Sequence, residues 1–317
     1  MQLKNLLKKF ALNTNRQNRK RCSPLLYFKM ANLKEIRTRI GSVASTMQIT
    51  SAMKMVSAAK LKRAQDAIIQ MRPYAEKLKN ILMNVSNSLD GSSENIYSQK
   101  RKLKKVLLIA IASDRGLCGA FNSNIFKASE KKITNYSKQK VEVQVYPIGK
   151  RSVDYFRGKH PLFKSNSTIF SNLNYGASEV LAKEVMNSFI NESFDKVEII
   201  YNEFKNAATQ DVVLKEFIPL ASFKSESSQS SDYILEPSSE DIVHNLIPKS
   251  LKIQFYKFLL ESHASEHGAR MTAMHKATDN AEDLKASLKL TYNRQRQAAI
   301  TNEILEIVGG AEALKQG

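Results

Sequence analysis

The chain has 317 residues, of which 42 % are apolar and 25 % charged, the usual balance of a water-soluble protein. Its longest clean apolar run, residues 106–112, is far shorter than the roughly 20 residues that a membrane-spanning helix needs. A transmembrane role is therefore not expected. Cys22 and Cys118 are its two cysteines, a usage that fits a reducing compartment.

The net charge of +19 is unevenly distributed, because residues 1–30 hold eight Lys or Arg and no Asp or Glu. Leu3, Leu6, Leu7 and Phe10 lie at helical spacing among these lysines. A basic amphipathic helix without a long apolar centre is typical of a mitochondrial presequence rather than of a secretory signal. We therefore expect residues 1–30 to be a presequence, and the alternative is a basic tail that binds nucleic acid.

Residues 31–90 have the composition and spacing of a long helix. Apolar side chains recur three and four positions apart, first over 33–47 and then over 64–89. Such a narrow stripe is the seam that a coiled coil requires. Pro73 should kink or interrupt this helix, because proline lacks an amide donor and clashes with the preceding turn.

Residues 103–221 alternate between strand-like and helix-like segments, which predicts a central α/β layered domain. We expect strands over 106–112, 141–148, 196–204 and 211–218, and helices over 121–136 and 178–194. A Ser-rich stretch over 222–239 is expected to be a loop.

The C-terminal segment, 240–317, is expected to be a second long helix. After Pro248 no proline appears, so about 60 residues can form one helix roughly 90 Å long. A helix of that length projects from a compact domain and needs a partner for its apolar stripe. The helix expected over 31–90 is the available partner.

Three parts of the chain match motifs of chemical sites but lack the companions of those motifs. Residues 263–267 match the H-x-x-E-H pattern of inverted zinc proteases, without a clear third ligand. Residues 51–54 and 57–60 match S-x-x-K, with neither S-D-N nor K-T-G elsewhere. The turn 113–119 lies between a strand and a helix, where phosphates bind, but it has no glycine-rich phosphate motif. We expect no catalytic residue, no cofactor and no metal, with zinc and phosphate sites as the alternatives.

Three stretches together resemble the ATP synthase gamma subunit of the F-type, mitochondrial enzyme. They are the first helix at 32–37, 49–56 and 59–61; the turn S-D-R-G-L-C-G-A-F-N at 113–122; and the last helix at 264–274, 277–281, 293–301 and 303–311. They occur in the family's order and spacing and extend over the chain from residue 31 to the end.

The resemblance implies a mixed α+β and α/β fold: a long antiparallel coiled coil of the N- and C-terminal helices plus a central Rossmann-like α/β domain. The coiled coil would be a rotor shaft inside a ring of alpha and beta subunits. The central domain would be the foot, which rests with the delta or epsilon subunits on the c-ring. Proton flow would turn the shaft and change the beta-subunit catalytic sites in turn. The location implied is the matrix side of the mitochondrial inner membrane, with peripheral membrane association through the complex, no nucleic acid and no catalysis by this chain.

The resemblance also implies two groups of contacts with the beta subunit. The upper group would touch a beta-subunit loop and consists of Arg296, Gln297 and Thr301. The lower group would meet an acidic lever of the beta subunit and consists of Met53, Lys54, Lys60 and Arg270.

Two other function classes remain as alternatives, a basic coiled-coil scaffold and a nucleic-acid-binding protein. A scaffold would not need the motif identities, and a nucleic-acid binder would need its basic charge outside residues 1–30. Lys132, in the helix expected over 121–136, is expected to be exposed.

Overall fold

The structure is a computed structural model that describes residues 33–88, 96–99, 101–207, 209–220 and 239–314. The presequence expected over 1–30 and almost all of the Ser-rich loop lie outside the described residues. The chain forms two compact units, Ser45–Glu282 and a second that combines Met1–Ala44 with Asp283–Gly317.

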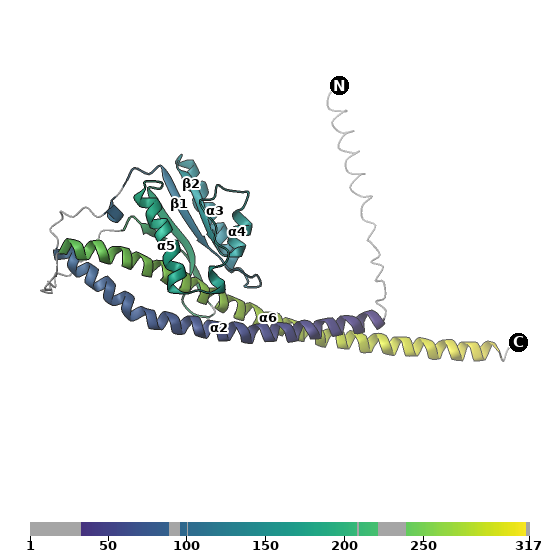
Figure 1. Ribbon diagram of the computed structural model, residues 1–317. Helices are drawn as coiled ribbons and strands as arrows, with labels where there is room; N and C mark the ends of the chain where they lie inside the picture. The colour runs from purple at the N-terminus through teal and green to yellow at the C-terminus, as the bar shows by residue number, and fades with distance from the viewer. Residues whose placement is uncertain (1–32, 89–95, 100, 208, 221–238, 315–317) are drawn as a thin grey trace, which may run out of the picture. The chain divides into compact units, whose positions relative to one another are not determined.

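The first unit is built on a four-stranded sheet (Figure 1). Its strands are β1 (Lys105–Ile111), β2 (Glu142–Ile148), β3 (Lys196–Phe204) and β4 (Gln210–Ile218). The order is β2-β1-β3-β4, with β1 parallel to β2 and β3, and β4 antiparallel to β3. Leu108 of β1 is in register with Val145 of β2 and Glu198 of β3. The central position of β1 explains its continuous apolar run, because both of its faces are buried.

Helices cover both faces of the sheet (Figure 1). The even-numbered side chains of 106–110 pack with α3 (Phe121–Lys138) and α4 (Lys150–Phe156). The odd-numbered side chains of 107–111 pack with α5 (Tyr175–Ile190) and α6 (Ser239–Ala313). This alternation follows from the two-residue period of a strand. The long C-terminal helix is therefore part of the core of the sheet domain.

The expected α/β domain is confirmed, with two differences. The short helix α4 was not predicted, because seven residues are too few for a clear helical period. Helix α5 begins at Tyr175 rather than Ser178, because the side chain of Asn174 caps it and accepts a hydrogen bond from the amide of Ala177 at 2.8 Å. Two 3-10 turns, η1 (Ile96–Ser98) and η2 (Ile169–Ser171), complete the elements.

Helices α2 (Leu33–Ser88) and α6 run antiparallel within the first unit. The hydroxyls of Thr50 and Thr278 lie 2.8 Å apart, while later residues of α2 pack against earlier residues of α6. That second contact is a buried cluster of Leu61, Ala64, Ile68, Leu260 and Ala264. The alanines allow the two helix backbones to approach closely.

Of the two effects predicted for Pro73, a kink or an interruption, the interruption does not occur, because α2 continues through it as one helix. Pro73 and Ile69 are both exposed, so water can bond the carbonyl of Ile69 that proline leaves without its helical donor. The last helix likewise begins before Pro248, at Ser239, and includes this proline in its interior.

The prediction that Lys132 is exposed is wrong. Its ammonium lies 3.3 Å from the carboxylate of Glu198, which is buried on the α3 face of the sheet. A second ammonium, from Lys196, lies 3.0 Å from the same carboxylate. A buried carboxylate needs paired cations, and that need draws Lys132 inward.

The second unit has an unusual distribution of apolar side chains. Ile36 of α2 is buried, whereas the C-terminal turns of α6 present apolar side chains to solvent. These are Ile300, Ile304, Leu305, Ile307 and Val308, each at least 47 % exposed. None of the helices in the described ranges is both long and apolar enough to cross a bilayer.

The α2–α6 seam gives the first prediction. Ala264 is fully buried in it, so Ala264→Leu should overpack the seam and lower the free energy of unfolding by about 1–3 kcal/mol. Chemical denaturation of the full chain measures this change. Ala52→Leu, at an exposed position of α2, is the matched control and should change stability by less than about 0.5 kcal/mol. Equal effects of the two substitutions would contradict the close approach at Ala264.

Candidate functional site

The site that the structure singles out is at the carboxyl ends of β1 and β3. In open α/β sheets this edge, where the strand order reverses, is the usual place for a ligand. Here β1 leads into the turn 113–119, and β3 leads into the loop that begins at Lys205. Both segments bond to one stretch of α6, residues 268–272.

The turn 113–119 is first stabilised by its own side chains. The Ser113 hydroxyl donates to the carbonyl of Arg115 at 2.6 Å. The side-chain amide of Asn122 donates to Ser113 Oγ at 2.8 Å and to Cys118 Sγ at 3.3 Å. These bonds hold Leu117 at a φ of 62°, a left-handed backbone conformation that residues other than glycine rarely adopt. The turn is therefore a rigid element with an exposed leucine at its apex.

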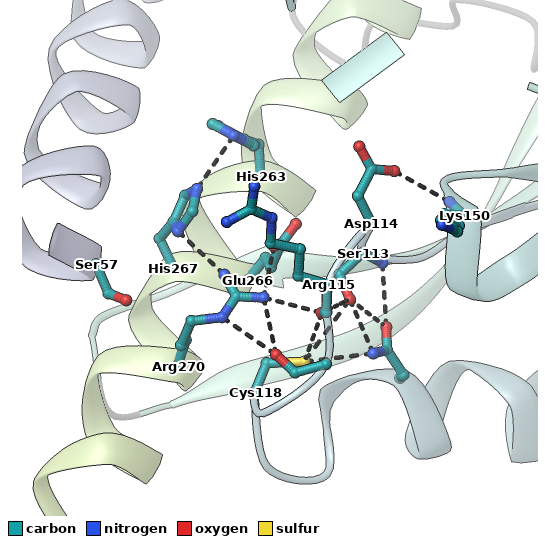
Figure 2. A network of polar contacts seen from close by, with 12 residues as sticks. Ser57, Ser113, Asp114, Arg115, Cys118, Lys150, His263, Glu266, His267 and Arg270 are labelled. Carbon is teal, nitrogen blue, oxygen red and sulfur yellow. Dashed lines mark hydrogen bonds and ion pairs between the residues drawn. The ribbon is translucent and has the colours of Figure 1, made fainter. Parts of the chain in front are cut away.

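Arg270 of α6 joins the long helix to this turn (Figure 2). Its guanidinium donates to the carbonyl of Arg115 at 2.9 Å and to that of Gly116 at 3.3 Å. It lies 2.8 Å from a carboxylate oxygen of Glu266, and it donates to Nδ1 of His267 at 3.3 Å. Only 6 % of Arg270 is exposed. A buried guanidinium is stable only when its donors have acceptors, and here the chain itself supplies them.

Glu266 and Arg270 form an ion pair enclosed by protein, because each side chain is only 7 % exposed. Burial raises the pKa of the Glu266 carboxyl above its ordinary value, while the adjacent Arg270 opposes that rise. Asp114 of the turn adds to the rise, and its carboxylate also accepts the amide of Lys150, the first residue of α4. The pair thus connects α6, the turn and α4 in one polar network.

A second clamp on α6, beside the contacts of Arg270, involves Gly268 and Thr272, which lie two residues before and two residues after Arg270. The carbonyl of Ala207, in the loop after β3, accepts the hydroxyl of Thr272 at 3.1 Å and the side-chain amide of Gln210 at 3.0 Å. Gly268 makes this approach possible, because a Cβ there would lie 3.2 Å from the same carbonyl. Helix α6 is therefore fixed to both strand ends, and its own side chains occupy the edge where many α/β proteins bind ligands.

The H-x-x-E-H match belongs to the same network. The Nε2 atoms of His263 and His267 lie 3.2 Å apart, but Nδ1 of His267 is bonded to Arg270. Glu266, which would be the base of such a zinc site, is paired with Arg270. The positive charges of Lys60 and Arg270 disfavour a cation beside these rings. Within the described ranges, no group of three His, Cys, Asp or Glu gathers as a metal site would require.

The other motif matches have structural roles. The hydroxyl of Ser57 donates to the carbonyl of Met53 at 2.7 Å on its own helix, and the residue is buried, so it is not placed as a nucleophile. Burial raises the pKa of the Cys118 thiol, so little of the reactive thiolate forms at neutral pH.

The expected contact residues occupy different surroundings. Lys60 is exposed on α2, Met53 is half-buried, and Lys54 Nζ lies 3.4 Å from Nδ1 of His275. Arg270 is buried, and its guanidinium bonds to groups of the chain itself. Arg296, Gln297 and Thr301 are exposed on α6 in the second unit, where the Thr301 hydroxyl donates to the carbonyl of Gln297 at 2.9 Å.

The comparison with known proteins is consistent along the chain. A family model described as ATP synthase matches residues 32–314. The ATP synthase gamma chain of Flavobacterium johnsoniae is 59 % identical over 286 residues, which are 90 % of this chain and 99 % of the relative. That of Christiangramia forsetii is 54 % identical over 285 residues, again 90 % of this chain and 99 % of the relative.

Solved structures agree with the fold. The central stalk and c-ring structure of the Tetrahymena thermophila mitochondrial ATP synthase contains a chain that is 28 % identical, with a TM-score of 0.56. The match covers 72 % of this chain and 99 % of that chain. A chain of the Euglena gracilis mitochondrial ATP synthase shares the fold at 20 % identity, with a TM-score of 0.64 over 89 % of this chain and 94 % of that chain.

The network around Arg270 gives the second prediction. Arg270→Met leaves Glu266 buried without its cation and should cost about 3–5 kcal/mol in the free energy of unfolding. Without Arg270 to oppose the effect of burial, the pKa of Glu266 in the folded variant lies further above its unfolded value than in the wild type. At low pH the carboxyl is protonated, so its burial no longer places an unpaired charge in the protein. The stability of the variant should therefore fall as pH rises above about 4.5.

The matched tests use the full chain. Adding Glu266→Gln to Arg270→Met should recover a large part of the loss, because no buried charge remains. Arg115→Met, an exposed side chain of the same turn, should stay within about 0.5 kcal/mol of the wild type. Additive effects of the Arg270 and Glu266 substitutions would show that the two side chains are not coupled.

Proposed function

The chain belongs to the family of ATP synthase gamma chains, and from this membership we infer that it is the central rotor shaft of an F-type ATP synthase. It is a non-catalytic subunit, and the catalytic sites are on the beta subunits. The observation that carries this conclusion is 59 % identity to a gamma chain over 99 % of that relative's length. The partners are the alpha and beta subunits, the delta or epsilon subunits and the c-ring.

The mechanism is coupling between rotation and conformation. Proton flow turns the c-ring, and the shaft turns with it inside the catalytic head. Each orientation of an asymmetric shaft stabilises one conformation of a neighbouring beta subunit, so the three catalytic sites change their nucleotide affinity in turn. No covalent bond is made or broken by this chain.

The contacts of Arg270 with the turn 113–119 and of Thr272 with Ala207 form a joint between the sheet domain and α6, and this joint fits the role. Torque from the c-ring that reaches the sheet domain must pass into the long helices without movement of the helices against the sheet. Arg270 and the second clamp at Ala207 fix α6 to the ends of two strands, and hydrogen bonds at fixed positions resist sliding and rotation better than apolar packing alone. We therefore propose that Arg270 acts inside the chain as part of this joint, not as a direct contact of the beta subunit.

The contact surfaces are proposals that rest on exposure and charge. The exposed donors Arg296, Gln297 and Thr301 form an upper contact for a beta-subunit loop. Nearby apolar side chains of α6, exposed in the chain alone, are suited to burial inside the catalytic head. Met53, Lys54 and Lys60 of α2 form the lower contact, where the lysines would face acidic side chains.

The domain division is also a proposal: shaft segments at 31–90 and 240–317, a foot at 103–221 and a Ser-rich loop at 222–239. The complex is membrane-associated. The two closely similar gamma chains described above are bacterial, so the mitochondrial matrix location and the presequence rest on the composition of residues 1–30 alone.

The upper contact gives the third prediction. Arg296→Ala with Gln297→Ala removes two exposed donors without disturbing the fold of the chain. We expect the rates of ATP synthesis and hydrolysis by the assembled complex to fall tenfold or more, because truncating one side of a buried charge-assisted contact costs about 2–5 kcal/mol and about 1.4 kcal/mol is a factor of ten in rate. Rates of both reactions in membrane vesicles are the measurement.

The control for this experiment is Lys131→Ala, at an exposed position of α3. The neighbouring Lys132 is unsuitable as a control because it pairs with buried Glu198. Activities equal to those of the Lys131 variant in both directions would mean that 296–297 is only a spacer. Loss of assembly would place the pair in the fold of the complex rather than in its coupling.

The N-terminus gives the fourth prediction. If residues 1–30 are a presequence, the intact mass of the subunit in the purified complex corresponds to a chain that begins near residue 31, and fusion of 1–30 to a reporter directs that reporter into mitochondria. A subunit of all 317 residues in the complex, or a reporter that stays outside mitochondria, would overturn the presequence.

A further inference from the structure

Two histidines extend the Arg270 network along α6 (Figure 2). A guanidinium has only donors, so Nδ1 of His267 must accept the bond from Arg270. A neutral imidazole carries one proton, which for His267 is then on Nε2. That N–H donates to Nε2 of His263, 3.2 Å away, so His263 carries its proton on Nδ1. Arg270 thus determines the direction of both hydrogen bonds, the one from Arg270 to His267 and the one from His267 to His263.

The surroundings keep both rings neutral. His263 stacks on Phe170, with ring planes 5° apart, and His267 is only 5 % exposed. The charged groups that act on the pair are Lys60 from α2 and Arg270 from α6, and Glu266 is paired with Arg270. Burial first, and then these positive charges, lower the pKa of His263 to about 4 and that of His267, which also feels His263, to about 3.

Neutrality of His267 has a direct geometric consequence. If His267 gained a proton, Nδ1 would become a donor directed at a donor of Arg270, and two like charges would meet in a buried site. The guanidinium would then have one acceptor fewer and a repulsive neighbour. Its bonds to the carbonyls of Arg115 and Gly116 would be weakened in turn.

We propose that His267 is a positioning residue of the shaft joint: its neutral ring, which accepts from Arg270 at Nδ1 and donates to His263 from Nε2, orients Arg270 toward the carbonyls of the turn 113–119. The role deepens the proposed rotor function and rests on it. The geometry of the joint, however, can be tested in the full chain without any rotation. The competing explanation is that His267 only fills space beside α2.

Two substitutions separate these explanations. His267→Leu keeps much of the volume and removes the acceptor, whereas His267→Asn places an amide oxygen close to the position of Nδ1 and cannot titrate. Cys118 reports opening of the turn, because its thiol is buried inside the turn network and its reaction with 4,4′-dithiodipyridine requires the turn to open. Each rate is divided by that of the unfolded chain at the same pH, in a Cys22→Ala background.

At pH 7.5 we expect His267→Leu to raise the normalised rate of Cys118 about tenfold or more, and His267→Asn to stay within about threefold of the parent chain. Equal rates for the Leu variant and the parent would overturn the proposal. Equal increases for Leu and Asn would show that the ring volume, and not its acceptor, holds the turn.

The pH dependence gives an independent readout. The folded pKa of His267 is lowered, so the opened turn binds a proton more readily than the closed turn between the folded value and the ordinary value of about 6.5. The closed joint is therefore most stable above about pH 6.5 and is lost as pH falls. From pH 7.5 to 5.5 the normalised rate should rise about tenfold through His267, and His267→Asn should remove that factor. Glu266 acts with the opposite sign, because its raised pKa favours the closed joint in acid. His263, whose pKa is also lowered, acts with the same sign in both chains, so the difference between the parent and His267→Asn is the part that belongs to His267.

The matched control is His160→Asn, which removes a histidine paired with Glu130 away from the joint and should leave the acid response of Cys118 unchanged. The same acid response in the parent and in His267→Asn would overturn the proposal. Proton pumping per ATP hydrolysed, measured in the assembled complex, tests the rotor function separately. A normal joint with failed pumping would refute the function, and normal pumping with an unaltered thiol rate in the Leu variant would refute the positioning role.

Discussion

A buried guanidinium needs an acceptor for its donors, and at Arg270 this requirement determines how the long helix meets the sheet domain. The acceptors come from the Arg115 and Gly116 carbonyls of the turn and from Glu266 and His267 of the same helix. The two carbonyls of the turn can be reached only at one rotation and one height of α6 against the sheet. A helix packed by apolar contacts alone could adopt several such positions, because dispersion contacts have little directional preference.

The same requirement explains why the usual ligand edge of the sheet does not serve a ligand in the usual way. A Rossmann-like sheet creates an edge rich in free backbone groups at the ends of β1 and β3. In this chain α6 supplies Arg270 and Thr272 to that edge. The edge of the sheet thus holds the long helix in place. The polar groups that resemble a binding site are hydrogen-bonded to side chains of α6.

The sequence was sufficient for the elements whose signal is local. The apolar run that became β1 and the two long helical periods were placed to within a few residues, because burial of β1 on both faces and the helical period each leave a direct pattern. It was insufficient to show that α2 continues through Pro73, which depended on the exposure of the surrounding turn. It was insufficient also for Lys132, whose surroundings depended on Glu198, 66 residues further along the sequence.

The joint itself could be predicted only in part. Glu266 and Arg270 stand four residues apart on one helix, a spacing that permits an ion pair, but the same spacing is common on exposed faces. Burial of the pair depended on backbone carbonyls of the turn, and carbonyls leave no mark in a sequence. The resemblance implied a beta-subunit contact for Arg270, and the burial of its side chain could not be predicted from the sequence.

The apolar end of α6 has a consequence for the cell that makes this chain. Side chains such as Ile304, Leu305 and Ile307 remain in water until a partner encloses them. A newly made copy without partners resembles a partly folded protein to chaperones and proteases, which recognise exposed apolar segments. Subunit supply and quality control are therefore linked through this helix end.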